Sequence, residues 1–163
     1  MAMWVLESLA RTDPTCLPAV VEALEPALES QNVSSARTLG KLQQEVALPY
    51  LRAQRDSTND FELAYLAWQM DGRTNDLWAA ADRALQAGVM WQFLACRTIR
   101  KLADTEPVPD AIQQHMQKIV SRPVDRYNDQ SHDFMWTTTA KDARSILELC
   151  GAKSGLAADK NCL

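Results

Sequence analysis

The sequence predicts an all-α fold, a single domain of about seven or eight antiparallel helices arranged as an irregular bundle or a short stack of helical hairpins. Apolar residues recur at helical spacing along most of the chain. No sustained apolar–polar alternation and no hairpin turn between β-branched runs marks a strand. With 163 residues, the chain can bury a core without metal or disulfide support.

Residues typical of helix ends divide the chain into segments. Asp13 is a predicted N-cap, with Pro14 as the first helical residue. Two further starts have the spacing of a capping box, namely Asn59 with Glu62 and Thr139 with Asp142. The predicted helices are Met3–Arg11, Pro14–Ser30, Val33–Arg55, Asp60–Met70, Asn75–Ala87, Val89–Ala103, Pro109–Ser121 and Ala140–Cys150.

Glycine and proline are expected to end or interrupt several of these helices. Gly72, Gly88 and Gly151 each follow an apolar-periodic segment, and Pro49 should break or kink the third helix because its ring removes a helix hydrogen bond. We therefore expect residues 1–150 to form the helical domain and residues 151–163 to form a C-terminal tail.

The most apolar segment is Val89–Ala103, which we expect to be the central helix, with Phe93 and Leu94 in the core. The tryptophans are also expected mainly in the core, although they could instead line a groove. They are Trp4, Trp68, Trp78, Trp91 and Trp136.

One stretch of the chain is repeated. The sequence LESLARTDP (6–14) resembles IRKLADTEP (99–107), with Leu9 matching Leu102 and Pro14 matching Pro107. The helix after each stretch is also similar once a two-residue slip is allowed. Repeated hairpins of this kind are typical of α-solenoids, although amphipathic helices can also resemble one another by chance.

The net charge of −4 argues against a nucleic-acid partner, which requires a surplus of Lys and Arg to displace counterions from phosphates. No apolar run is long enough to span a bilayer, and we expect a soluble chain without a signal peptide. The predicted helix 14–30 carries an acidic row, Glu22, Glu25 and Glu29, beside its apolar stripe. This row is a candidate surface for a basic protein partner, with ordinary solvated charge as the alternative.

The four cysteines contain no C-x-x-C pair. Cys96 lies in an apolar segment and is expected in the core. Cys150 and Cys162 flank a short, polar, glycine-containing segment that could close into a disulfide. Such a bond would indicate a periplasmic or secreted protein, and two reduced thiols would indicate the cytoplasm.

His115, His132 and Asp133, followed by Asp142 or Asp159, resemble the metal-binding pattern of the HD-domain phosphohydrolases. The resemblance implies an all-α fold and a divalent metal that activates water against a phosphate ester. The sequence departs from the family because Pro123 and a polar run separate the histidines and few residues follow the His-Asp pair. A helix entrance at residues 131–133 is the simpler interpretation.

No other catalytic motif is evident, so we expect a protein that is not an enzyme and needs no cofactor. The function we expect is a non-enzymatic protein-binding module, such as an inhibitor, a toxin-neutralising immunity protein or an adaptor. The alternatives are the HD-type phosphohydrolase and a carrier that holds a small apolar ligand between helices.

Overall fold

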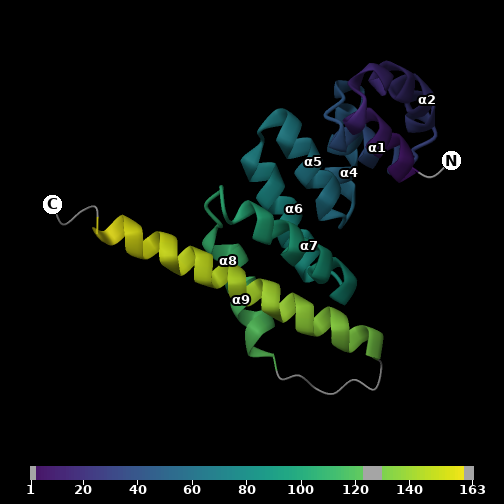
Figure 1. The fold of residues 1–163 in the computed structure, drawn as a ribbon. Coiled ribbons are helices and arrows are strands. Elements are labelled where there is room, and N and C mark those ends of the chain that lie inside the picture. Colours follow the sequence, from purple (N-terminus) through teal and green to yellow (C-terminus); the bar gives the residue numbers. More distant parts are fainter. Residues whose placement is uncertain (1–2, 123–129, 160–163) are drawn as a thin grey trace. The chain divides into compact units, whose positions relative to one another are not determined.

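The computed structural model describes the backbone of residues 3–122 and 130–159, and the side chains of residues 3–122 and 134–151. This part of the chain contains nine α-helices and two short 3-10 helices, which confirms the predicted all-α class (Figure 1). None of the described helices is both long and apolar enough to cross a membrane.

The chain divides into two compact units, Met1–Leu77 (unit 1) and Trp78–Leu163 (unit 2), with the boundary inside helix α6. We describe each unit by itself. The predicted division into a domain of residues 1–150 and a tail of residues 151–163 stays a prediction.

Unit 1 contains the helices that come before this boundary, together with the first turn of α6. They are α1 (Met3–Thr12), η1 (Pro14–Cys16), α2 (Leu17–Glu29), α3 (Val33–Lys41), η2 (Glu45–Ala47), α4 (Leu48–Ser57) and α5 (Phe61–Asp71). The start predicted at Asp13 is confirmed, because its carboxylate accepts a hydrogen bond from the Thr15 N–H at 3.0 Å. The break predicted before Pro49 is also confirmed, since α3 ends at Lys41 and Pro49 lies in the first turn of α4.

One predicted N-cap is displaced by a residue. Asp60, rather than Asn59, caps α5, and its carboxylate accepts from the Glu62 N–H at 3.2 Å. The side chain of an Asp two residues before a backbone N–H can accept from it as easily as the side chain of an Asn three residues before it. Sequence spacing alone therefore does not show which of the two residues is the N-cap. The capping box predicted at Asn59 was wrong.

Three helices of unit 1 end at a residue with left-handed backbone conformation. Gly72 ends α5 as predicted, with φ +67° and its N–H bonded to the Trp68 carbonyl. Gln31 (φ 56°) follows α2 and Gln43 (φ 54°) follows α3. Each of these two turns has the paired backbone hydrogen bonds of a Schellman motif, in which glycine is the usual left-handed residue.

The core of unit 1 brings α1 to α5 together around small and branched apolar side chains. Its buried members are Ala10, Val20, Leu24, Ala36, Leu39, Ala47, Leu51, Leu63, Leu66 and Ala67. Gly40 on α3 allows a close approach here, since a Cβ at this position would lie 2.9 Å from Leu51 Cδ1 and 3.3 Å from Leu66 Cβ.

A cluster of charges is buried at the end of α5. The side chains of Asp71 and Arg55 are 2% and 3% exposed, and Arg55 Nη1 lies 3.3 Å from Asp71 Oδ2. Asp71 also accepts from Arg52 Nε at 2.9 Å and from the Arg73 N–H at 3.0 Å. Arg55 contacts Asp76, in the first turn of α6, at 3.0 Å.

Unit 2 contains the rest of α6 (Thr74–Gln86), then α7 (Val89–Leu102), α8 (Asp110–Ser121) and α9 (Gln130–Asp159). Helix α9 packs against both α7 and α8. It starts ten residues before the predicted helix 140–150 and continues through Gly151. The capping box at Thr139 and the helix end at Gly151 were therefore both wrong.

The position of Thr139 explains one of these errors. Its side chain is buried inside α9, and its hydroxyl donates to the Met135 carbonyl at 2.6 Å, one turn earlier. Thr can satisfy its hydroxyl within a helix in this way, so a Thr-x-x-Asp spacing does not require a helix start.

Helix α7 contributes to the core of unit 2, but not through the aromatic residue expected there. Phe93 and Leu94 are only half-buried, whereas the buried residues of α7 are Gln92, Ala95, Cys96, Ile99 and Leu102. The tryptophans also differ from the expectation of a shared core. Trp78 is buried, Trp68, Trp91 and Trp136 are half-buried, and Trp4 is 72% exposed.

The two repeated stretches of sequence share one backbone hydrogen bond at the connection between their helices. The Asp13 N–H donates to the Leu9 carbonyl at 2.8 Å, and at the matching positions the Glu106 N–H donates to the Leu102 carbonyl at 2.7 Å. Each turn leads into a helix, α2 in unit 1 and α8 in unit 2. The two connections differ otherwise, since α1 continues to Thr12 and Pro14 begins η1, whereas α7 ends at Leu102 and α8 begins at Asp110.

The charge cluster predicts a large effect for Asp71→Asn. Arg55 would remain buried without its buried carboxylate, so we expect a loss of about 3 kcal/mol in the free energy of unfolding, measured by urea denaturation at neutral pH. Asp56→Asn is the matched control, because Asp56 also contacts Arg55 but is 69% exposed. Its loss should stay below about 1 kcal/mol, and equal losses would contradict the buried role of Asp71.

The loss of stability caused by Asp71→Asn should depend on pH. Burial by itself raises the pKa of Asp71, but hydrogen bonds from Arg73 and Arg52 and the Arg55 charge outweigh it and hold the pKa below its ordinary 3.8. The ionised carboxylate therefore stabilises the fold above that pH, and its contribution is lost as the pH falls through the lower folded-state pKa. The difference in free energy of unfolding between wild type and Asp71→Asn should therefore become smaller as the pH falls below 3.8. Urea denaturation of both proteins over a series of pH values measures it.

The packing of α7 predicts a second contrast. Ile99 is fully buried, so Ile99→Ala should lower the free energy of unfolding by about 2–5 kcal/mol. Phe93→Ala should cost less, because the ring already contacts solvent. Urea denaturation of both variants tests this, and a larger loss for Phe93→Ala would show that the core of unit 2 lies elsewhere.

Candidate functional site

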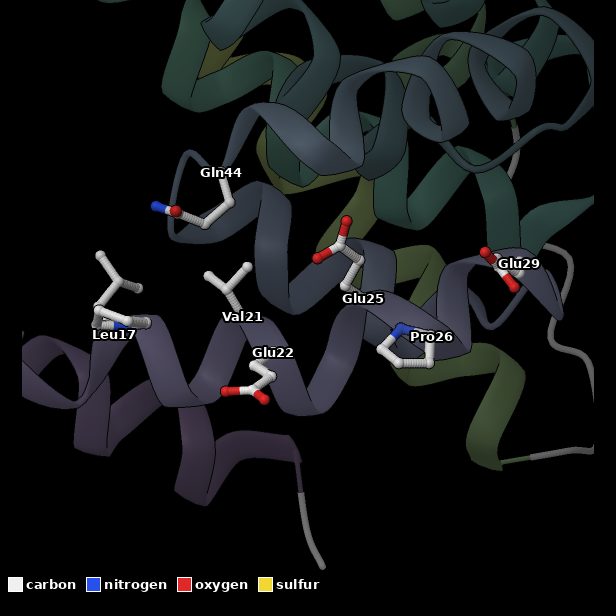
Figure 2. A pocket seen from close by; sticks show the side chains of 8 residues that line it. Leu17, Val21, Glu22, Glu25, Pro26, Glu29 and Gln44 are labelled. Atoms are coloured by element: carbon white, nitrogen blue, oxygen red, sulfur yellow. The ribbon is translucent and has the colours of Figure 1, made fainter.

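The three glutamates singled out in the sequence line a groove on unit 1. This α2 groove has a volume of about 860 Å³ and is formed by one side of α2 together with the turn that follows α3. Its lining residues are Leu17, Pro18, Val21, Glu22, Glu25, Pro26, Glu29 and Gln44. In Figure 2, Leu17, Val21 and the Glu25 carboxylate extend from α2 toward the side on which Gln44 lies.

Helix geometry explains how α2 serves both the core and the groove. Val20 and Leu24 are 3% and 4% exposed and face the core. Leu17 and Val21 pack against that core at its edge, and each also lines the groove. The predicted apolar stripe is therefore confirmed, and its outer edge forms the apolar part of the groove.

The acidic row occupies the exposed side of the same helix. Glu22, Glu25 and Glu29 are all exposed, at spacings of three and four residues that place them along one side of α2. Three carboxylates beside apolar side chains can accept hydrogen bonds from Lys or Arg while the apolar part contacts an aliphatic or aromatic group.

Two prolines and a glutamine of the groove were not singled out from the sequence. Pro26 lies inside α2 and has no N–H to donate to the Glu22 carbonyl, which adds a backbone acceptor on this part of the helix. Gln44 is positioned by the left-handed Gln43 before it, and its side-chain amide donates to the Leu42 carbonyl at 2.7 Å. The prolines lie on α2 itself, whereas only the tertiary structure brings Gln44 to the α2 groove.

The lining of the α2 groove combines carboxylates, one amide and apolar side chains. Its lining residues include no Ser, Cys, His or Lys, and its ionisable groups are the carboxylates of Glu22, Glu25 and Glu29. Its chemistry is that of hydrogen-bond acceptors and apolar contact.

His115, one of the two histidines of the HD-type metal pattern, contacts a carboxylate outside that pattern. His115 Nε2 lies 2.8 Å from Asp82 Oδ1, and Asp142 pairs with Arg100 at 3.3 Å. The side chains of His132, Asp133 and Asp159 lie outside the described residues, so the HD-type alternative is not tested. Among the residues whose side chains are described, no three His, Cys, Asp or Glu are grouped closely enough to hold a metal ion.

The backbone of residues 131–133 lies in the first turn of α9, which agrees with the predicted helix entrance. The disulfide predicted between Cys150 and Cys162 stays a prediction, because Cys162 lies outside the described residues. Cys150 itself does not end its helix, since α9 continues to Asp159.

A hollow of about 480 Å³ between α8 and α9 is the place to consider for the carrier alternative. Ile119, Val120 and Trp136 give it an apolar part, and the Arg122 guanidinium lies 5.5 Å from the centre of the Trp136 ring. Lys141 and Arg144 also line it. These cations make the hollow a poor match for a purely apolar ligand.

The chain was compared with family models, with curated proteins and with solved structures, and nothing matches it.

The described cysteines predict a difference in reactivity. Burial, together with the nearby Asp142 charge, raises the pKa of Cys96 to about 12. Its Sγ also lies 3.8 Å from Met116 Sδ in the interior of unit 2. At pH 8 the folded protein should therefore incorporate iodoacetamide at half-buried Cys16 and leave Cys96 unmodified until urea unfolds it.

Peptide mapping by mass spectrometry measures both sites in one sample. Alkylation of Cys96 as fast as Cys16 in the folded protein would show that α7 and α8 do not enclose this thiol.

Proposed function

We propose that the protein is a non-enzymatic protein-binding module, and that its α2 groove accepts a basic segment of another protein that also carries an apolar side chain. The observation that supports this most is the coincidence of the predicted acidic row with a groove that has an apolar edge. Charge selects and orients such a segment, and contact with Leu17 and Val21 adds affinity.

A basic amphipathic helix fits this chemistry best. Laid along α2, it could present Lys or Arg at spacings of three and four residues, which match the spacings of Glu22, Glu25 and Glu29. An inhibitor, an immunity protein or an adaptor would each use such a surface, and the choice among them depends on the partner.

The test combines a defined probe with a charge-matched control. The probe is a fluorescein-labelled 16-residue helical peptide of Lys, Leu and Ala, and its binding is measured by fluorescence anisotropy. We expect the triple variant Glu22→Gln/Glu25→Gln/Glu29→Gln to bind it about tenfold more weakly than wild type, because several modest charge contacts are lost together.

The control variant, Glu45→Gln/Asp56→Asn/Asp110→Asn, removes the same charge from exposed positions outside the groove. It should bind like wild type at 0.15 M salt. A similar loss in both variants would mean that the peptide responds to the overall negative charge, and it would remove the groove from the proposal.

The natural partner can then be sought by differential capture. A protein retained by wild type and by the control, but lost from the triple Gln variant, would be a partner of the groove. Its binding segment should be basic, and a partner that binds through an acidic or uncharged segment would contradict the proposal.

A further inference from the structure

A second surface of opposite charge lies on unit 2. Helix α7 exposes Arg97, Arg100 and Lys101, and α9, which packs against α7, exposes Lys141 and Arg144. The cations of α9 come about forty residues after those of α7 in the sequence, and the two groups lie on separate helices. Tertiary packing therefore gathers positive charge that the net charge of the chain conceals.

The cations surround two adjoining hollows along the contact between α7 and α9. Phe93, Phe134 and Thr138 line the larger hollow, of about 510 Å³, together with Arg97, Arg100 and Lys101. Lys141 and Arg144 line the smaller one, and Arg100 borders both. We call the five cations with Phe93 and Phe134 the α7–α9 surface.

Phe134 gives this surface an apolar anchor. Its side chain is 67% exposed, and Phe93 beside the same hollow is half-buried. A partner side chain that covers these rings removes apolar area from water, which favours binding. Exposed aromatic side chains beside Arg are also typical of the residues that dominate binding energy at interfaces.

Most of the positive charge is available to a partner. Asp142, 8% exposed, pairs with Arg100 at 3.3 Å, yet the Arg100 side chain stays 54% exposed. Within the part of the chain that the structure describes, no salt bridge joins Arg97, Lys101, Lys141 or Arg144 to a carboxylate.

We infer that the α7–α9 surface docks an acidic protein segment that carries at least one large apolar or aromatic side chain. Carboxylates of the segment would meet the cations of both helices, and its apolar side chain would enter the hollow beside Phe134. The inference does not rest on the α2 groove, because it concerns another unit and a partner of the opposite charge.

The arrangement of charge favours an acidic polypeptide over a nucleic acid. Asp104 lines the larger hollow and Glu148 the smaller one, so a continuous row of phosphates would meet carboxylates at both. The whole chain is also acidic, with a net charge of −4, which opposes a long polyanion. A short peptide can place neutral residues opposite Asp104 and Glu148.

The experiment uses the full-length protein and a fluorescein-labelled 16-residue peptide of Glu, Phe and Ala with Glu at helical spacing. Anisotropy should show binding by wild type and a loss of about tenfold or more for Lys141→Glu/Arg144→Glu, because attraction becomes repulsion at two positions. Phe134→Ala should also weaken binding, and a ring this exposed should contribute little to folding. Thermal melts confirm that each variant is folded.

Two controls separate this surface from general charge. Lys118→Glu reverses an exposed lysine of unit 2 that lines neither hollow, and it should leave binding unchanged. The same peptide with Gln in place of Glu should not bind. Equal weakening by Lys118→Glu and by Lys141→Glu/Arg144→Glu, or no binding of the acidic peptide to wild type, would overturn the inference.

Other occupants give distinct results. Binding of a labelled 16-nucleotide oligouridine more tightly than the peptide, with the same dependence on Lys141 and Arg144, would identify a nucleic-acid surface instead. Sedimentation velocity showing self-association that Lys141→Glu/Arg144→Glu abolishes would assign the surface to a second copy of the chain. Either result would overturn docking of an acidic segment from another protein.

Discussion

Arg55 and Asp71 bring opposite charges into the interior of unit 1, and the chain around them is arranged to satisfy both groups. A buried carboxylate or guanidinium left without partners would cost several kcal/mol, and each of these two groups has more than one partner. Asp71 is the last residue of α5, Arg55 lies near the end of α4 and Asp76 lies in the first turn of α6. The cluster thus fixes where three helices end or begin.

The backbone at this point is matched to the charges. Gly72 adopts the left-handed conformation directly after Asp71, and the following Arg73 N–H turns back to the Asp71 carboxylate. Without the reversal at Gly72, that N–H would continue along the helix and the carboxylate would lose one of its donors. Helix termination and charge burial are therefore parts of one constraint, and the apolar core of α1 to α5 packs beside it.

Local signals were readable from the sequence because their physics is local. Asp13 with Pro14, Pro49 and Gly72 act through the backbone within a few residues, and each lies where expected. Gln31 and Gln43 adopt left-handed conformations that their residue type does not favour, so the packing of the helices must impose them. Such positions carry no signal in a single sequence.

The candidate surfaces also combine features that are local in the sequence with features that depend on tertiary packing. The acidic row of α2 was readable because its members share one helix, whereas Gln44 reaches the groove from another segment. The cations of α7 give no such signal, because nothing in the sequence places Lys141 and Arg144 beside them. Unit 1 contains eleven acidic and six basic residues, whereas unit 2 contains ten acidic and eleven basic residues. The net charge of the whole chain does not reveal this difference.

The two repeated stretches allow the exposed side of α2 to be compared with that of α8. Asp13 and Glu106 make the same backbone hydrogen bond, and each turn leads into a helix with a buried stripe. When the two helices are aligned by their buried residues, which takes one residue of slip rather than the two of the sequence match, Val20 and Leu24 of α2 match Ile112 and Met116 of α8.

In that alignment the exposed acidic row of α2 matches neutral residues of α8, which are Gln114, Gln117 and Ser121. A helix with a matching pattern of buried residues therefore does not need carboxylates on its exposed side. Packing therefore accounts for the apolar stripe of α2 and leaves its glutamates open to solvent or to the partner proposed above.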